Sequence, residues 1–137
     1  MRDHRRIIAF QEADALVVAV YRWTDTFPAD ERYVLKSQIR RTAVSIAANI
    51  VEGAARSSHG EYVNHLNFAL GSAAELSYLV GLAVRIYPSL ARSGNELPTA
   101  DVIKLLVKLI DRLQSDGPKT GPARAQRAPA KSLEPRA

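Results

Sequence analysis

Proline constrains this chain most, because it divides the sequence into segments that have helical periodicity. Apolar residues between Phe10 and Phe27 recur every three or four positions, which places them on one face of a helix, and Pro28 ends that pattern. Pro88 and Pro98 interrupt the chain in the same way and enclose a predicted loop. Since no segment shows sustained alternation of apolar and polar residues, the sequence predicts an all-α fold without strands.

Capping signals set the boundaries of the predicted helices. The pattern predicts four helices, over about residues 8–27, 29–56, 58–87 and 99–115. Pro28 suits the first turn of the second helix, where its missing N–H has no intrahelical partner. Ser58 and Glu61 form a capping box at the start of the third helix, and Thr99 is a natural N-cap for the fourth. Short connections between long helices favour an antiparallel up-and-down four-helix bundle within residues 1–115.

Residues 116–137 differ from the rest of the chain, being rich in Gly, Pro, Ala, Lys and Arg. The segment holds too little apolar surface to offset the entropy lost on ordering, so we expect a disordered basic tail. Its five Lys and Arg residues against two acidic ones supply +3 of the formal net charge of +5. Two interpretations stay open, a basic arm for nucleic acid or an acidic partner, and a solubilising terminus without specific role, of which we favour the second.

The second and third predicted helices each carry two apolar rows, although a helix in an isolated bundle needs only one. One row on each helix can fill the core: Ile39, Ala43, Ile46, Ile50 and Gly53, with Tyr62, Leu66, Ala69, Ala73, Leu76 and Val80. The other rows would expose a large apolar patch, which predicts subunit contacts in a homo-oligomer. The residues predicted for that interface are Val44, Ala48, Val51, Phe68, Leu79, Leu82 and Ile86. A wide core stripe on long helices is the alternative.

The most distinctive polar feature is a ridge along the second helix. It consists of Arg41, Ser45, Asn49, Glu52 and Arg56, spaced by four, four, three and four residues. These steps keep the side chains on one helical face. The arginines could bind phosphates, but we favour hydrogen bonds within and between helices, with Glu75 as a further partner, because unsatisfied polar groups beside apolar rows are costly.

A basic cluster occupies the first half of the same helix. It consists of Arg32, Lys36, Arg40 and Arg41, and together with Arg56 these are the candidate nucleic-acid-binding residues. Such a cluster can neutralise the phosphates of a nucleic acid. The commoner alternative is a solvated helix face paired with Asp30 and Glu31. Apart from Tyr33, no aromatic residue interleaves with the cluster, so sequence-specific recognition of single strands has little support.

Sites for catalysis or cofactors have weak support. The chain has no cysteine, and His59 and His65 stand six residues apart, not the four that would align them on one helical face with Glu61 between. Glycines are scattered singly, so no phosphate-binding loop or nucleophile elbow is present. We therefore predict no metal and no cofactor.

The longest strongly apolar run, residues 15–21, is short for a membrane span, and we expect a cytoplasmic protein without membrane contact.

Three segments of the chain carry a family resemblance, FPADERY at 27–33, SQIRRTAVSIAANIVEG at 37–53 and ALGSAAEL at 69–76. They resemble the four-helix-bundle proteins encoded within intervening sequences of 23S rRNA genes, and the resemblance covers most of residues 8–87. The residues that match the family pattern are Arg40, Arg41, Ser45, Asn49, Glu52, Gly53, Arg56, Gly71 and Glu75. Ala47 replaces the family's usual proline, and Gln11 stands where tryptophan is frequent.

The resemblance implies an up-and-down bundle assembled into a ring, commonly a pentamer, and gives no indication of an enzyme. Its link with ribosomal RNA genes suggests association with RNA through genomic context, which is an associational argument. The sequence thus favours a non-catalytic homo-oligomeric bundle that binds RNA or DNA non-specifically through basic surface. The alternatives are a scaffold whose partner is another polypeptide and, third, an uncharacterised enzyme.

Overall fold

Helices make up nearly all of the structure, a computed structural model that describes residues 2–31 and 33–117. The described helices are η1 (His4–Arg6), α1 (Ile8–Thr24), η2 (Ala29–Glu31), α2 (Leu35–Ala55), α3 (His59–Ile86), η3 (Pro88–Leu90), α4 (Ala91–Asn95) and α5 (Thr99–Asp116). No strand occurs within these ranges, so the predicted all-α class is confirmed for them. Arg32 and most of the predicted tail, residues 118–137, lie outside the described residues.

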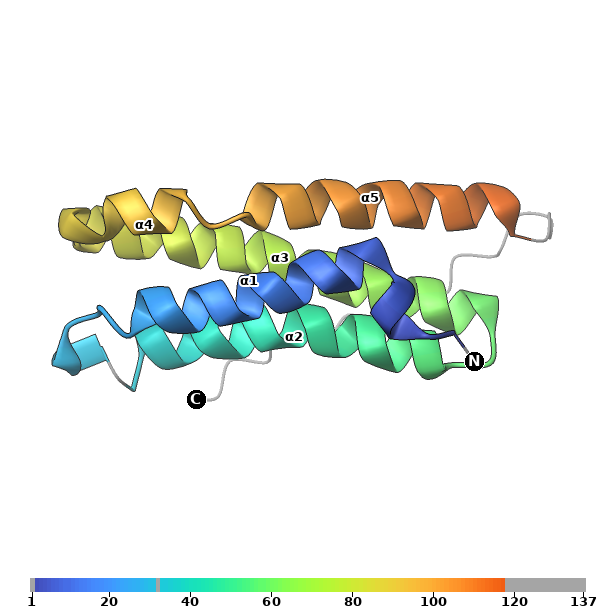
Figure 1. Ribbon diagram of the computed structural model, residues 1–137, viewed down its shortest axis with the longest axis horizontal. Coiled ribbons are helices and arrows are strands. Elements are labelled where there is room, and N and C mark those ends of the chain that lie inside the picture. Colours follow the sequence, from blue (N-terminus) through green and yellow to red (C-terminus); the bar gives the residue numbers. More distant parts are fainter. Residues whose placement is uncertain (1, 32, 118–137) are drawn as a thin grey trace, which may run out of the picture.

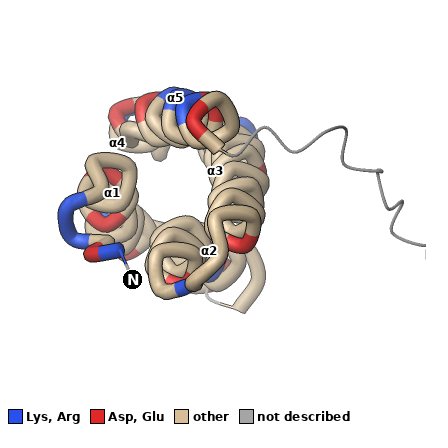
Figure 2. The backbone as a smooth tube through the Cα atoms, turned by 90° about the vertical axis from the view of Figure 1, so that its right-hand side faces the viewer, with Lys and Arg blue, Asp and Glu red and all other residues tan. Residues whose placement is uncertain are grey.

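Four long helices, α1, α2, α3 and α5, lie side by side around a shared core, and consecutive ones run in opposite directions (Figures 1 and 2). The α2–α3 pair has the most extensive contact, whereas α1 and α5 form the loosest of the four seams. The short α4 prolongs the line of α5 beyond its N-terminal end (Figure 1).

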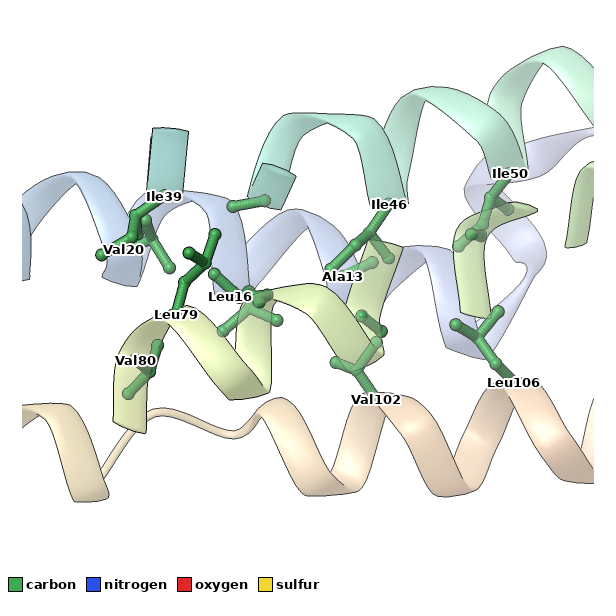
Figure 3. Close-up of a cluster of buried hydrophobic side chains, with 14 of the residues drawn as sticks. Ala13, Leu16, Val20, Ile39, Ile46, Ile50, Leu79, Val80, Val102 and Leu106 are labelled. Carbon is green, nitrogen blue, oxygen red and sulfur yellow. The ribbon is translucent and has the colours of Figure 1, made fainter. Parts of the chain in front are cut away.

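The predicted core rows of α2 and α3 are buried in full, as the helical period requires. From the other long helices, Leu16 and Val20 of α1 and Val102 and Leu106 of α5 are completely buried among them (Figure 3). Leu79 also belongs to this core, at 8% exposure. Its prediction as a subunit-interface residue is therefore wrong, because its side chain packs inward in the single chain.

The chain between α1 and α2 differs from the prediction. The helix expected to reach Phe27 ends at Thr24, where the Thr26 hydroxyl donates to the carbonyl of Trp23 at 2.6 Å and the Phe27 N–H donates to that of Thr24. Pro28 directly precedes the short η2, whose Glu31 N–H donates to the Pro28 carbonyl at 3.0 Å, and α2 starts only at Leu35. Proline suits the first turn of either helix type, so its position alone did not fix which one forms.

The N-termini of α3 and α5 show whether the predicted helix caps form. The Ser58 hydroxyl accepts the Glu61 N–H at 3.0 Å, which confirms the predicted N-cap of α3. Thr99 is the first residue of α5 and not its cap, because Pro98 holds the cap position and the buried Thr99 hydroxyl has no hydrogen-bond partner among the described residues. The loop predicted between Pro88 and Pro98 contains η3 and α4.

Candidate nucleic-acid interface

A depression of about 490 Å³ lies where the N-terminal half of α2 passes the end of α1. The residues that line it are Tyr21, Lys36, Ser37, Arg40 and Arg41. Three cations, a hydroxyl and an aromatic ring therefore face one hollow, and no carboxylate is among these described lining residues. We call this feature the basic depression.

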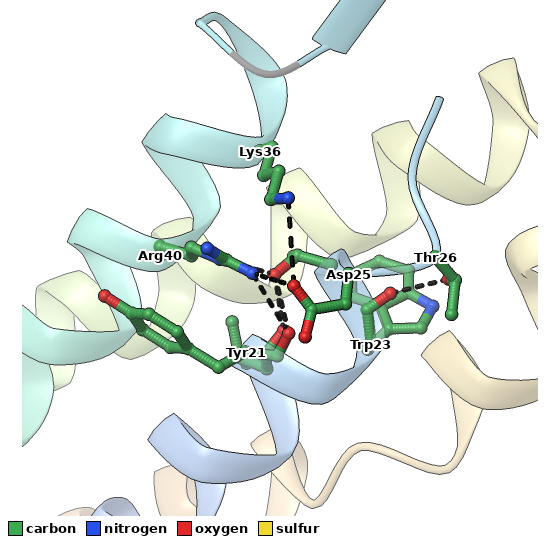
Figure 4. A network of polar contacts seen from close by, with 8 residues as sticks. Tyr21, Trp23, Asp25, Thr26, Lys36 and Arg40 are labelled. Carbon is green, nitrogen blue, oxygen red and sulfur yellow. Dashed lines mark hydrogen bonds and ion pairs between the residues drawn. The ribbon is translucent and has the colours of Figure 1, made fainter. Parts of the chain in front are cut away.

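Arg40 is held at the end of α1 by a network of hydrogen bonds (Figure 4). Its Nε donates to the Thr24 hydroxyl at 2.7 Å, and its Nη2 donates to the Tyr21 carbonyl at 3.1 Å and to Asp25 Oδ1 at 2.9 Å. The last carbonyls of a helix lack intrahelical partners, so the guanidinium caps α1 while it belongs to α2. Arg40 thus fixes one wall of the basic depression against the other.

The charges of the basic depression are only partly neutralised. Asp25 Oδ1 accepts from Arg40 and lies 3.9 Å from Lys36 Nζ, so one carboxylate faces two cations. Arg41 is exposed and forms no ion pair with a described carboxylate. The Arg40 guanidinium also lies over the Tyr21 ring, 4.3 Å from its centroid. An excess of positive charge therefore remains beside an aromatic face.

Among the described residues, the basic cluster of α2 does not pair with Asp30 and Glu31 in the way that the alternative interpretation expects. The cluster uses Asp25, the residue after α1, whereas Glu31 accepts a hydrogen bond from the Tyr87 hydroxyl. That hydrogen bond, together with burial and the Glu31 charge, raises the pKa of Tyr87. Glu31 therefore joins η2 to the end of α3 and is not among the residues that line the basic depression.

The five predicted nucleic-acid-binding residues do not form one site. Lys36, Arg40 and Arg41 meet in the basic depression. Arg56 is the C-cap of α2, roughly 24 Å farther along at 1.5 Å per residue. Arg32 lies outside the described residues. Sequence reasoning missed Tyr21, whose only signal was an aromatic residue near the end of the first predicted helix.

The polar ridge of α2 joins that helix to α3. The hydroxyl oxygens of Ser45 and Ser72 lie 2.9 Å apart, and the Asn49 amide nitrogen donates to the Ser45 carbonyl at 2.8 Å. His65 Nδ1 lies 3.4 Å from Asn49 Oδ1 and 3.7 Å from Glu52 Oε2. The central residues of the ridge thus make interhelical contacts, which supports the favoured structural interpretation.

Glu75 does not join that ridge. Its Oε1 accepts from Gln38 Nε2 at 3.0 Å, nearer the start of α2. Two of the ridge residues, Arg41 and Arg56, stay exposed. The side-chain polar contacts between α2 and α3 named here involve Gln38, Ser45, Asn49 and Glu52 of α2, and neither arginine of the ridge takes part in them.

The predicted subunit-interface residues retain much exposed apolar surface after Leu79 is removed. Phe68 is 53% exposed, Ile86 50% and Val44 41%, whereas Val51 and Leu82 are half-buried and Ala48 is exposed. Tyr78, which the prediction omitted, is 61% exposed. On α2 this apolar row lies about 100° around the helix from the ridge, so it faces away from the seam with α3.

One described helix, α3, has the length and hydropathy to cross a membrane, with a mean hydropathy of 1.3 over 18 residues of which 33% are buried. Counting contiguous apolar residues missed it, because small and polar residues interrupt the run. One side of α3 forms the core, and Ser72 and Glu75 bond to α2. The core helix of a protein outside a membrane passes the same test of length and composition.

The histidines serve as links between helices. His59 Nε2 lies 2.8 Å from the Leu113 carbonyl oxygen and so joins the start of α3 to α5. His65 lies beside Asn49 and Glu52 as described above. Within residues 2–31 and 33–117, no group of three or more His, Cys, Asp or Glu residues could hold a metal ion.

Comparison with known proteins places these features in context. A sequence model of the 23S rRNA-intervening sequence protein family matches residues 5–97 of this chain, which include α1 to α4. A crystal structure at 1.70 Å resolution of a protein with unknown function from the S23 ribosomal protein family of Bacteroides thetaiotaomicron VPI-5482 is similar, with a TM-score of 0.66 and 25% identity. The match covers 76% of this chain and 96% of that chain. No curated protein matches the chain.

Proposed function

The chain belongs to the 23S rRNA-intervening sequence protein family, and from that premise we propose that it is a non-catalytic, ring-shaped homo-oligomer, a pentamer of antiparallel four-helix bundles, that binds RNA or DNA without sequence preference. The observation that carries the proposal is the basic depression, where Lys36, Arg40 and Arg41 converge. The solved relative is described as a protein of unknown function, so the comparison supports a fold and names no reaction.

The chemistry of the basic depression suits a phosphodiester backbone. Arg41 and Lys36 are available to neutralise phosphates, whose displaced counterions favour binding. Ser37 adds a hydroxyl donor, and the Tyr21 ring, 43% exposed, offers a face to one base. Contacts of this kind position a nucleic acid without distinguishing its sequence.

Self-association would multiply such a contact. Exposed apolar side chains on α2 and α3, chief among them Phe68, Ile86 and Val44, favour coverage by neighbouring subunits. A ring would present one basic depression per subunit, so a single strand could meet several weak sites at once. On this proposal the apolar side of α3 contacts protein and not lipid, and the protein acts in the cytoplasm.

Binding assays across salt concentrations test the proposal. Fluorescently labelled single-stranded RNA and DNA of mixed sequence are titrated with the full chain and with the double variant Lys36→Glu, Arg41→Glu. Loss of two phosphate contacts should reduce the slope of log affinity against log salt by about 1.4. We expect the affinity near physiological salt to fall at least about 10-fold, since contacts to phosphates dominate such affinity.

The matched control is Lys104→Glu, Lys108→Glu, which changes the net charge equally on α5, away from the basic depression. This variant should keep most of the affinity and the full slope. The proposal fails if the wild-type chain shows no salt-sensitive retention of any nucleic acid, or if the two double variants lose affinity equally.

A further inference from the structure

A second hollow, of about 650 Å³, lies between the start of α1 and the end of α5. Its apolar residues are Ile7, Ile8, Leu105, Leu109 and Leu113, with Ala9 and Tyr62 beside them. Four cations complete its lining: Arg2, Arg6, Lys108 and Arg112. We call this hollow the α1–α5 groove. It is at the opposite end of α1 from the basic depression.

The α1–α5 groove follows from how the N-terminal segment is anchored. The Arg2 N–H donates to the Ala54 carbonyl at 3.0 Å, and Arg2 Nη1 donates to the Arg56 carbonyl at 2.9 Å. These bonds tie the segment to the end of α2, beside the loosest seam between the long helices. Apolar side chains remain uncovered there, since Ile8 is 63% exposed and Leu109 is only half-buried.

The cations of the α1–α5 groove form no ion pairs with the described carboxylates, although the charge of Arg6 acts on the nearby Asp3. None of the four forms an ion pair with a carboxylate in the described part of the chain, and no acidic residue is among those that line the groove. The nearby Asp3 is engaged by Arg5, whose hydrogen bond lowers the pKa of that carboxyl. Burial raises the pKa of Tyr62, while the charges of Arg2 and Arg112 act on it in the opposite direction.

We propose that the α1–α5 groove binds an acidic amphipathic helix of a partner protein. Leu105, Leu109 and Leu113 recur at four-residue steps, so they form a ridge along α5 roughly 12 Å long, which spans about two turns of a partner helix. Apolar residues of the partner would pack on this ridge in the manner of a helix in a groove. Glu or Asp side chains on its flanks would meet Arg6 on one side and Arg112 on the other.

Geometry favours a helix over a fatty acid of the same charge. The α1–α5 groove is open to solvent along one side, as the exposure of Ile8 indicates. An acyl chain lying there would keep part of its apolar surface in water, whereas an amphipathic helix turns its polar face outward. The inference does not depend on nucleic-acid binding, because the two sites share no residue.

Peptide binding to the full chain tests the inference. The probe is a labelled 18-residue peptide with leucines at helical spacing flanked by glutamates. A second peptide has the same composition in an order without helical periodicity, and decanoate serves as a competitor. We expect the amphipathic peptide to bind at least about 10-fold more tightly than the reordered one, to gain helical circular dichroism on binding, and to resist displacement by decanoate.

Variants locate the binding. Arg6→Glu with Arg112→Glu should weaken the amphipathic peptide at least about 10-fold, since it reverses the charge on both flanks. Ile8→Gln should weaken it several-fold, and because Ile8 is largely exposed the fold tolerates this change. Lys36→Glu with Arg41→Glu, in the basic depression, should leave peptide binding unchanged and so separates this inference from the proposed function.

Several outcomes would overturn the inference. Equal binding of the two peptides would mean that net charge alone explains the binding. Unchanged binding by the Arg6 and Arg112 variant would mean that the peptide binds outside the α1–α5 groove. Displacement by decanoate at lower concentration than by unlabelled peptide would assign the α1–α5 groove to an acyl anion. A wild-type oligomer that ignores the peptide but dissociates in the Arg6 and Arg112 variant would make the occupant a second copy of this chain.

Discussion

Replacing Gly53 by alanine tests a close approach between α2 and α3. An added Cβ would lie 2.7 Å from His65 Cβ, 3.2 Å from Tyr62 Cδ2 and 3.3 Å from the Tyr62 carbonyl oxygen. The nearest atom is fixed to the backbone of α3, so relief requires the two helices to separate. Alanine normally stabilises a helix interior by about 0.5–1 kcal/mol relative to glycine. Overpacking costs about 1–3 kcal/mol, so we expect a net loss of up to about 2.5 kcal/mol.

Gly81→Ala is the matched control, because, apart from its chain neighbours and the backbone of its own helix, no described atom lies within 4 Å of its added Cβ. This variant should gain about 0.5–1 kcal/mol from helix propensity alone. Urea unfolding followed by circular dichroism, at one protein concentration for all variants, measures both changes in the free energy of unfolding. If Gly53→Ala proves as stable as Gly81→Ala, the close packing of α2 on α3 described above is incorrect.

Three further substitutions probe the core, a buried hydrogen bond and the response to pH. Leu106→Ala should lower the free energy of unfolding by about 2–5 kcal/mol, because Leu106 is fully buried; in a urea titration, a loss below 1 kcal/mol would contradict this. Trp23→Phe removes the donor to the Leu90 carbonyl and should cost about 1–3 kcal/mol by the same assay, with an unchanged value as the contrary result. Burial raises the pKa of Tyr62 above its ordinary 10.0, so its contribution to stability is complete below pH 10 and is lost as the pH rises through the folded pKa. Urea titrations at increasing alkaline pH should therefore show a smaller decline for Tyr62→Phe than for wild type, and equal declines would refute that assignment.

The sequence predicted a helix boundary well where a single capping residue or proline determines it. The Ser58 cap and Pro88 bounded α3 to within one residue of its observed limits, and the three-to-four-residue period identified the core rows of α2 and α3. The start of α2 was missed because Pro28 is compatible with a 3-10 helix as well. The inward position of Leu79 was missed too, since spacing along one helix does not reveal which of its faces the neighbouring helices cover.

The candidate sites depend more on tertiary structure. Spacing along one helix was enough to group Lys36, Arg40 and Arg41. That Arg40 would cap α1 could not be read from sequence, because the contact requires the distance between two helices. The α1–α5 groove joins residues from both ends of the chain, and no local pattern brings Arg6 and Arg112 together.

The mass of the full chain in solution tests the central claim, that exposed apolar side chains on α2 and α3, such as Phe68, are covered by other copies of this chain. Light scattering during size exclusion, repeated over a range of protein concentrations, measures it directly. The account predicts a discrete particle of about five times the 15.0 kDa of one chain. A particle that stays at 15.0 kDa up to the highest concentration reached would contradict it.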